Sequence, residues 1–438
     1  MTTDLIETAP QMDLAIQDIE PLVEELRASH ALYSPLLQRR EQQEAAYTYL
    51  QGLLAPLPRK SIEPMVLAVE GVAPQAVRAM PAFISEGPWP DERRLHQHWQ
   101  EVETDLGAAE GVLMVDGSDV PQQGSHSAGV KRQYCGELGQ RANGQAGVFV
   151  GDVSPQGYTR LDRRLSVPGE GRTADAYTER RRPCGIPPQL TFKTQPALAQ
   201  EMVAAIVQTQ YLRCRWVVAD EACGGNPGFL EGMAELGRGY VAEVPPSTRV
   251  WDVRPAAHVP PWRGRGRRPQ RACLVTGAPA ARTVAAVAAT LPSEAWTCQT
   301  SKEGSQGPMV AECATLRVVA VRDAVPGPDV WLVRRRHVET GELKTSLCHA
   351  PVETALAHLV RMSGRRWPLE TCVEDSKQRL GMGDDARRSW TGWHHHLTLV
   401  ILAHFFVVRM SRRLKKSPSG DVASGRHGVG VGLTPPRV

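Results

Sequence analysis

The sequence lacks the features of an exported protein, a membrane-spanning protein or a zinc ribbon. None of its nine cysteines forms a Cys-x-x-Cys pair, which argues against a zinc ribbon and a disulfide framework. We expect no signal peptide, because the first residues show no basic segment followed by an apolar one. The longest apolar run, 397–408, is interrupted by His404 and too short to cross a bilayer. Free thiols and a cytoplasmic, nucleoid-associated location are therefore expected.

The chain also lacks a strong net charge, which is only +4 over 438 residues. Total charge is thus weak support for a nucleic-acid partner, but the distribution of Lys and Arg is uneven. Such clusters suit a polyanion, since Arg and Lys contacts to phosphate are the usual source of DNA affinity, although solubility is the alternative explanation. The clusters lie at 160–164, 180–182, 263–271, 334–336 and 409–416.

The length is sufficient for two or three domains, and the spacing of apolar residues changes along the chain. Residues 1–107 show apolar positions at helical spacing, which predicts a helical N-terminal domain that binds DNA or serves as a scaffold or dimerisation unit. We expect an α/β core in two parts, the first at 108–244 and the last core helices at 350–412. Between them, at 245–349, we expect a β-rich basic insertion with its own small sheet. The tail, at 413–438, is expected to be disordered.

Two short apolar runs in the predicted core each end in a carboxylate. The first is Gly111-Val112-Leu113-Met114-Val115 before Asp116, and the second is Cys214-Arg215-Trp216-Val217-Val218-Ala219 before Asp220. The strands and helices predicted around them follow an α/β order, in which ligands gather at the ends of strands. A single aspartate in such a place is usually a turn former or a helix cap.

A third acidic residue stands in a segment with charges at helical spacing, from Arg366 to Lys377. At about 100° per residue, Glu370 lies roughly 40° from Arg366 and roughly 20° from Lys377 around the helix. Pro368 is tolerated in the first turn of a helix. A carboxylate between two cations stays ionised and can bind a hard metal ion, although a solvent-exposed ion-paired helix face is the alternative.

Three carboxylates on separate elements fit two-metal phosphoryl transfer. Two divalent cations about 4 Å apart need oxygen ligands, so that one activates the attacking hydroxyl and the other stabilises the leaving oxygen. Mg²⁺ prefers a few carboxylates together with water and substrate phosphate. Asp116, Asp220 and Glu370 are the candidate ligands for Mg²⁺ or Mn²⁺, with two ions in the site.

The spacing Arg366-x₃-Glu370-x₆-Lys377 resembles the glutamate signature of DDE-type insertion-sequence transposases. The resemblance covers most of the chain, because further motifs follow in the same order. They are the first-aspartate region Val115-Asp116-Gly117-Ser118-Asp119, the second-aspartate region Val218-Ala219-Asp220-Glu221-Ala222-Cys223-Gly224, and the segment Arg388-Ser389-Trp390-x-Gly392-Trp393-His394-His395-His396.

This resemblance implies an RNase H-like mixed sheet flanked by helices, with Asp116, Asp220 and Glu370 as catalytic metal ligands. Arg366 and Lys377 would contact DNA phosphate or steady the glutamate. The chain departs from the family at five positions. Ser363 and Cys223 replace usual tyrosines, Gly117 replaces an acidic residue, and Gln122 and Gln123 replace basic ones.

Two other motifs carry competing interpretations. The segment Trp262-Arg263-Gly264-Arg265-Gly266-Arg267-Arg268 suits a loop that grips nucleic acid, because the aromatic ring stacks on bases and the arginines hold phosphates, whereas a flexible linker is the alternative. Three consecutive histidines, 394–396, suggest zinc. Adjacent histidines on a helix point about 100° apart, however, so packing or phosphate contact is the better prediction.

The leading hypothesis is a transposase that binds the ends of a DNA insertion element, cleaves the strands and joins them to target DNA. Its partners would be double-stranded DNA, both terminal inverted repeats and target, and a second copy of the chain that pairs two ends. A catalytically inactive, transposase-derived DNA-binding protein is the alternative, and an unrelated RNase H-like nuclease is a third hypothesis.

Overall fold

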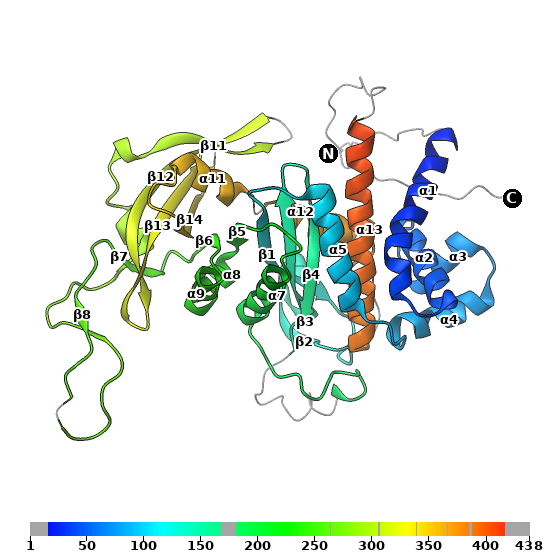
Figure 1. Cartoon of the computed structure of the whole chain (residues 1–438), viewed down its shortest axis with the longest axis horizontal. Coiled ribbons are helices and arrows are strands. Elements are labelled where there is room, and N and C mark those ends of the chain that lie inside the picture. Colours follow the sequence, from blue (N-terminus) through cyan, green and yellow to red (C-terminus); the bar gives the residue numbers. More distant parts are fainter. Residues whose placement is uncertain are drawn as a thin grey trace, which may run out of the picture.

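The computed structural model describes residues 16–416 apart from 168–180, 263, 305–306, 339, 366 and 385–387. The side chains of 16–20, 137, 300–309, 367–370 and 415–416 also lie outside the description. Within these limits the protein is mixed α/β, with one large mixed sheet and helices packed on both of its faces (Figure 1). Much of the predicted tail falls outside the described residues, but its first four residues, 413–416, are helical.

Helices form the first described part of the chain, as the helical spacing of apolar residues predicted. Their apolar faces pack together and against the long helix α13 (Trp390–Lys416), so that α1 to α4 lie beside this helix in Figure 1. The five α-helices and one 3₁₀ helix are α1 (Ile16–Tyr33), η1 (Ser34–Leu36), α2 (Arg40–Leu54), α3 (Ile62–Glu70), α4 (Pro74–Ser85) and α5 (Asp91–Leu106).

Five strands form the centre of the large sheet in the order β4-β3-β1-β5-β6. Strands β1, β5 and β6 are parallel, while β3 is antiparallel to both of its neighbours, β1 and β4. This order is consistent with the predicted RNase H-like core. The strands of this part, with β2 at the edge, are β1 (Val112–Pro121), β2 (Lys131–Cys135), β3 (Gln140–Ser154), β4 (Gly157–Leu165), β5 (Trp216–Ala219) and β6 (Gly239–Glu243). A short 3₁₀ helix, η2 (Gly136–Leu138), separates β2 from β3.

Alternation of side chains divides the core into two layers. Leu113 and Val115 of β1 face one apolar cluster, which includes helices α5, α7 (Gln195–Thr209) and α9 (Pro227–Glu235). Val112 and Met114 face the opposite cluster, which includes residues of α11 (Leu356–Gly364) and α12 (Trp367–Arg379). Both faces of the sheet are therefore buried.

The predicted insertion is rich in strands, but the expectation of a separate small sheet is wrong. Strand β14 (Leu343–His349) pairs with β6, so the insertion extends the core sheet into one of 12 strands. Only β8 (Ala257–His258) and β9 (Cys273–Leu274) form a second, two-stranded sheet within the described residues. The other elements here are β7 (Arg249–Trp251), β10 (Arg282–Thr283), α10 (Val284–Ala288), η3 (Ser293–Ala295), β11 (Thr297–Gly304), β12 (Gly307–Arg322) and β13 (Val325–His337).

The apolar run that the sequence placed in a buried helix forms the middle of α13. Phe405 and Phe406 in this run are almost completely buried, and His404 is buried beside them. In the part of the chain that the structure describes, no helix has the length and apolar character needed to cross a membrane. All nine cysteines carry free thiols, and seven of them are buried.

Candidate active site at the carboxyl ends of β1 and β5

Asp116 lies within β1 rather than at its end. The apolar run Val112–Val115 pairs with β5 on one side and with β3 on the other. Strand β5 ends at Ala219, whereas β1 continues to Pro121 and keeps β3 as its partner. Asp116 is thus the first residue of β1 beyond its pairing with β5, and its side chain is partly exposed.

Asp220 follows the last residue of β5 and caps the one-turn helix α8 (Glu221–Gly224). Its carboxylate accepts a hydrogen bond of 3.0 Å from the backbone N–H of Cys223. The close approach of α8 to β6 requires Gly224, because a Cβ at this position would lie 1.9 Å from the carbonyl oxygen of Glu243. The cap and the glycine together fix where the chain turns after β5.

The strand register brings the two aspartates side by side. Val115 is paired with Ala219 in the parallel ladder, so Asp116 and Asp220 occupy the next position on neighbouring strands. The backbone of Asp220 is still extended, with φ −75° and ψ 179°. Met114 and Val218 belong to the apolar cluster that includes α11 and α12 residues, and alternation turns Asp116 and Asp220 toward that same face.

Cys223 lies close to both carboxylates. Burial raises the pKa of its thiol well above the usual range, and the negative charges of Asp220 and Asp116 raise it further. The thiol is almost fully buried, at 3% exposure, and stays protonated at neutral pH. The cysteine that stands where related sequences usually have tyrosine is therefore a direct neighbour of the aspartate pair.

Helix α12 carries the third predicted acidic residue. The segment is helical from Trp367 to Arg379, with Pro368 in its first turn, as expected. Cys372 of this helix belongs to the same buried cluster as Met114 and Val218, so α12 covers the face toward which the aspartates point. The side chain of Glu370 and the whole of Arg366 lie outside the described residues.

Lys377 is brought to the aspartate strand itself. Its Nζ donates a hydrogen bond of 2.8 Å to the carbonyl oxygen of Asp119, three residues beyond Asp116. Burial raises the pKa of the Asp119 carboxyl, while the charges of Lys131 and Lys377 lower it. No group of three or more His, Cys, Asp or Glu side chains among those described is arranged to hold a metal ion. The described side chains supply two of the three predicted ligands.

Sequence reasoning missed a charged group next to this site. Glu243 ends β6 and stands beside Asp220 in the register, because Ala219 pairs with Ala242. Arg335 of β13 and Lys344 of β14 approach its Oε1 at 4.0 and 3.9 Å. Arg335 also donates a hydrogen bond of 3.3 Å to the Oγ of Ser363, the other residue in the place of a usual tyrosine. Only the pairing of β14 with β6 reveals this neighbourhood.

Most of the chain matches a known family model. Residues 32–308, which are more than half of the chain, match the family model described as DDE superfamily endonuclease. The chain belongs to this family. The matched region includes Asp116 and Asp220 and ends before α12, so Glu370 depends on the spacing of its own motif.

One relative of this chain is described as an insertion-sequence transposase. The chain is 24% identical over 221 residues to a probable transposase for insertion sequence element IS701 from Microchaete diplosiphon. The match covers 49% of this chain and 52% of the relative, so it spans about half the length of each protein.

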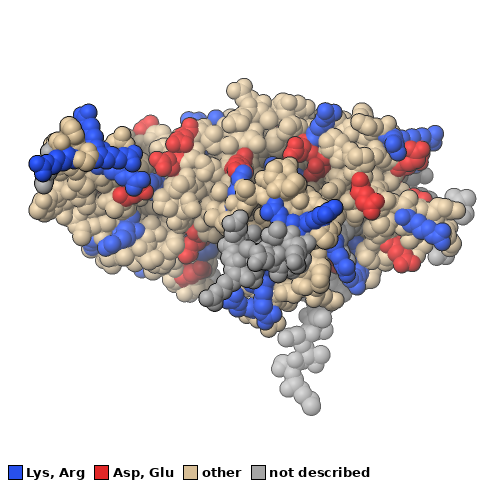
Figure 2. All heavy atoms as spheres, turned by 90° about the horizontal axis from the view of Figure 1, so that it is seen from below, with Lys and Arg blue, Asp and Glu red and all other residues tan. Residues whose placement is uncertain are grey.

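The predicted DNA-gripping loop of this DDE-family chain is exposed. Arg265, Arg267 and Arg268 lie with Trp262 in the long connection between β8 and β9, and Trp262 is 53% exposed. Arg263 lies outside the described residues. The loop hangs below the insertion in Figure 1, and Figure 2 shows Lys and Arg gathered at the end of the molecule that the insertion forms.

The basic cluster at 160–164 is largely buried. Arg160 and Arg163 of β4 are 0% and 1% exposed, so this part of the run 160–164 cannot contact a polyanion. Arg163 donates hydrogen bonds to the carboxylates of Asp91 and Asp162, and to Thr398 of α13. The polyanion interpretation is therefore wrong for Arg160 and Arg163, whereas the side chain of Arg164 is 30% exposed and pairs with Asp162.

The three consecutive histidines are buried in α13 and separate in direction. His394 contacts the carbonyl oxygen of Trp390, and His396 contacts the hydroxyl of Tyr49. His395 lies between the carbonyl oxygens of Ile84 and Trp89. Burial lowers the pKa of His395 to about 4, so this ring is neutral at pH 7. The predicted packing role is confirmed for these described side chains.

Proposed function

We propose that this protein is a transposase that binds the ends of a DNA insertion element and catalyses metal-dependent strand cleavage and strand transfer. Asp116, Asp220 and Glu370 are its catalytic residues and metal ligands. The observation that carries the proposal is the register of β1 and β5, which sets Asp116 beside Asp220 on the sheet face that α12 covers.

The residues present suit hard divalent cations. Two carboxylates stand about one strand spacing apart, at about 4.8 Å between backbones, and both are directed to the same face. The thiol of Cys223 is buried beside them, and this burial raises its pKa. Glu370 completes the set from α12, where helical spacing puts it about 20° from Lys377.

Two Mg²⁺ or Mn²⁺ ions, when bound, would activate the attacking hydroxyl and stabilise the leaving oxygen. The chain itself has three tasks at this site. Asp116 and Asp220 hold the ions at the rigid end of the parallel strands. Lys377, through its hydrogen bond to the carbonyl oxygen of Asp119, fixes α12 against β1 and thereby positions Glu370. Arg366 then contacts DNA phosphate.

DNA is held by residues outside the carboxylate group as well. In the proposal, Arg265, Arg267 and Arg268, together with Arg263, hold phosphates while Trp262 stacks on bases. The substrates are the terminal inverted repeats of the element and the target duplex. Two copies of the chain, each with one end, form the complex that brings two ends together.

The test uses the full chain and DNA fragments taken from both flanks of its own coding sequence, with Mg²⁺ or Mn²⁺ present. Asp116→Asn, Asp220→Asn and Glu370→Gln should each abolish cleavage and joining of a labelled end. Asparagine at 220 retains the capping hydrogen bond, so loss of activity would reflect the lost charge rather than a lost cap. Thermal unfolding of each variant provides the check on folding.

Glu374→Gln is the matched control, because Glu374 lies on the same helix, is exposed and is hydrogen-bonded only to the Gln378 amide among the contacts of described residues. It should leave cleavage unchanged. Cleavage that survives in Glu370→Gln would refute the triad. Specific binding of the flanks without any metal-dependent cleavage by the wild-type chain would instead identify a transposase-derived DNA-binding protein.

A further inference from the structure

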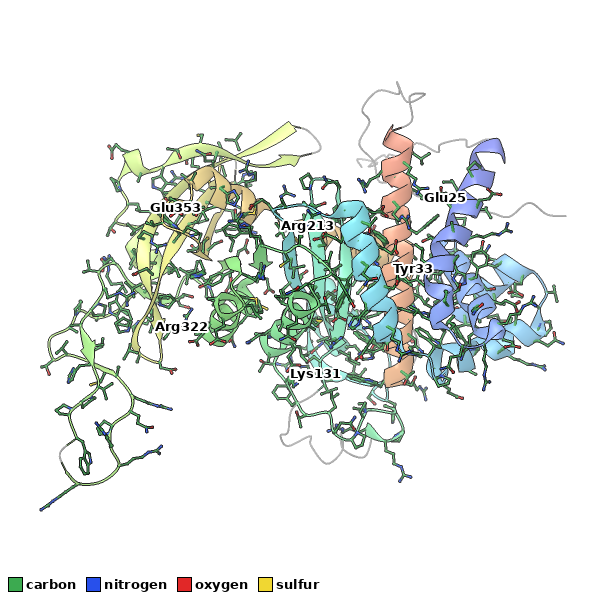
Figure 3. The ribbon with its side chains drawn as sticks, in the orientation of Figure 1. Glu25, Tyr33, Lys131, Arg213, Arg322 and Glu353 are labelled. Atoms are coloured by element: carbon green, nitrogen blue, oxygen red, sulfur yellow. The ribbon has the colours of Figure 1, made fainter. Side chains whose placement is uncertain are left out.

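A large concavity lies at the edge of the core sheet opposite the two aspartates. Its volume is about 1170 Å³, and its walls come from the residues before β1, the first residues of β5 and β6, and helix α11. The parallel strands begin at this edge, and at the other edge the parallel pairing of β1 with β5 stops just before Asp116 and Asp220. In Figure 3, Glu353 and Arg213 mark the two sides of this edge, and Lys131 marks the other edge.

The lining of the groove is mostly apolar or uncharged, but it includes four arginines. Arg215 and Arg238 stand on the core side, and Arg361 and Arg365 stand on α11. The carboxylate of Glu110 already pairs with Arg215 at 2.7 Å, and it also accepts a hydrogen bond from the indole of Trp216. Of the acidic residues that line the groove, this leaves Glu353, which is exposed. The lining therefore has an excess of positive charge.

Arg361 and Arg365 are held close together without a carboxylate in hydrogen-bond or ion-pair contact among the described residues. They stand one helical turn apart, and Arg361 donates only to the ring of His358, at 3.4 Å. Burial lowers the pKa of Arg365 and the charge of Arg361 lowers it further, although the carboxyl of Asp152 raises it. Burial likewise lowers the pKa of His358, followed by the charge of Arg361, although Glu110 raises it. An anion in the groove would relieve this repulsion.

We propose that this groove binds the phosphate backbone of a DNA segment other than the one at the carboxylates. Its volume exceeds the range of about 300–1,000 Å³ that is typical of small-molecule sites, which favours an extended ligand over a free nucleotide. Arginines on two facing walls match the two sides of a charged strand. The proposal does not depend on the catalytic triad.

The experiment measures DNA binding without divalent cations, so that catalysis plays no part. A short, fluorescein-labelled duplex of arbitrary sequence is titrated with the full chain at several salt concentrations. Arg361→Ala should weaken binding several-fold and reduce the slope of log affinity against log salt concentration by about 0.9, the value for one lost phosphate contact. Arg361→Lys should restore most of the slope.

Arg213→Ala is the matched control, because Arg213 lies at the same edge of the sheet but outside the groove and pairs with Glu103. It should change the slope far less. Hydrogen exchange on the wild-type chain gives a second readout, in which the duplex should protect the groove segments 237–239 and 349–362.

Three results would overturn the proposal. Equal losses in Arg361→Ala and Arg213→Ala would mean that only general surface charge is involved. Absence of protection in 237–239 and 349–362 would mean that DNA binds elsewhere. Protection of these segments by inorganic phosphate or a free nucleotide, as strong as that given by the duplex, would identify a small phosphate compound as the ligand. Loss of cleavage in Asp116→Asn with unchanged groove binding would separate this site from the triad.

Discussion

Two arginine-rich segments differ in whether their side chains are buried or exposed. In the segment 160–164, Arg160 and Arg163 are buried beneath helices, whereas Arg265, Arg267 and Arg268 of the segment 262–268 are exposed on a loop. The difference lies in the surroundings of each segment. A cluster of arginines in a sequence therefore identifies a polyanion surface only when the fold leaves it on the outside.

The physical cause is visible in the flanking elements. β4 lies in the central sheet and is covered by α5, α12 and α13, so Arg160 and Arg163 are removed from water. The exposed loop is joined by strands of only two residues each, β8 and β9, and turns through Gly264 and Gly266, whose φ values are 79° and 73°. No apolar layer covers it in the described structure.

Arg163→Met should produce the largest effect on stability. The substitution leaves Asp91 and Asp162 without the guanidinium that now donates to both, and the loss of one partner of a buried ion pair costs about 3–5 kcal/mol. Burial acts to raise the pKa of Asp91, but the charge of Arg163 and its hydrogen bond to this carboxylate lower it to about 2. Chemical denaturation should show the loss at pH 7. The same change in the loop, Arg265→Met, should stay within about 0.5 kcal/mol, and equal losses would contradict the comparison.

Asp152 should give a pH-dependent effect of intermediate size. Burial raises the pKa of this carboxyl to about 8, assisted by the charge of Glu103, although Arg365 opposes the shift. Because the folded chain binds this proton more tightly than the unfolded chain, the contribution to stability falls as pH rises from about 4 to about 8. Asp152→Asn removes this dependence.

The advantage of Asp152→Asn over the wild-type chain should therefore grow by at most about 1.4 kcal/mol per pH unit within that window. Denaturation at a series of pH values measures it. Asp252→Asn, on the exposed surface of the insertion, serves as the control and should show a difference below about 0.5 kcal/mol at each pH. A parallel shift of both variants with pH would show that burial of Asp152 is not the cause.

Arg267→Ala should have the smallest effect, with none on stability. If the loop holds DNA phosphate, one lost contact lowers the salt slope of duplex binding by about 0.9. Arg282→Ala removes the same charge from the insertion at a residue that pairs with Asp252 and should change the slope less. Fluorescence anisotropy at several salt concentrations compares the two variants. Equal slopes would leave the exposed loop without a role in binding.

Much of the fold follows from local patterns in the sequence. The apolar runs before Asp116 and Asp220 are strands β1 and β5, and the segment around Glu370 is helix α12, as predicted. These elements were legible because period and burial agree within a few residues. The continuation of the core sheet through β14 could not be predicted from local patterns, since it depends on the pairing of strands about a hundred residues apart in the chain.

The candidate site was predicted only in part for the same reason. Spacing and order marked Asp116, Asp220 and Glu370, whose roles stay a proposal. Glu243, Arg335 and Cys223 had no comparable signal, because their nearness to the aspartates arises from register and from the turn at α8. Contacts that form between several strands cannot be recognised in the sequence of any one of those strands.

The sequence alone determined which segments become strands and helices, because apolar periodicity and helix caps act over a few residues. The tertiary structure decided which charges are buried and which are exposed. It turned Arg163 inward to Asp91 and left Arg267 on the surface, because the cost of burying a charge depends on the partners that distant parts of the chain bring to it.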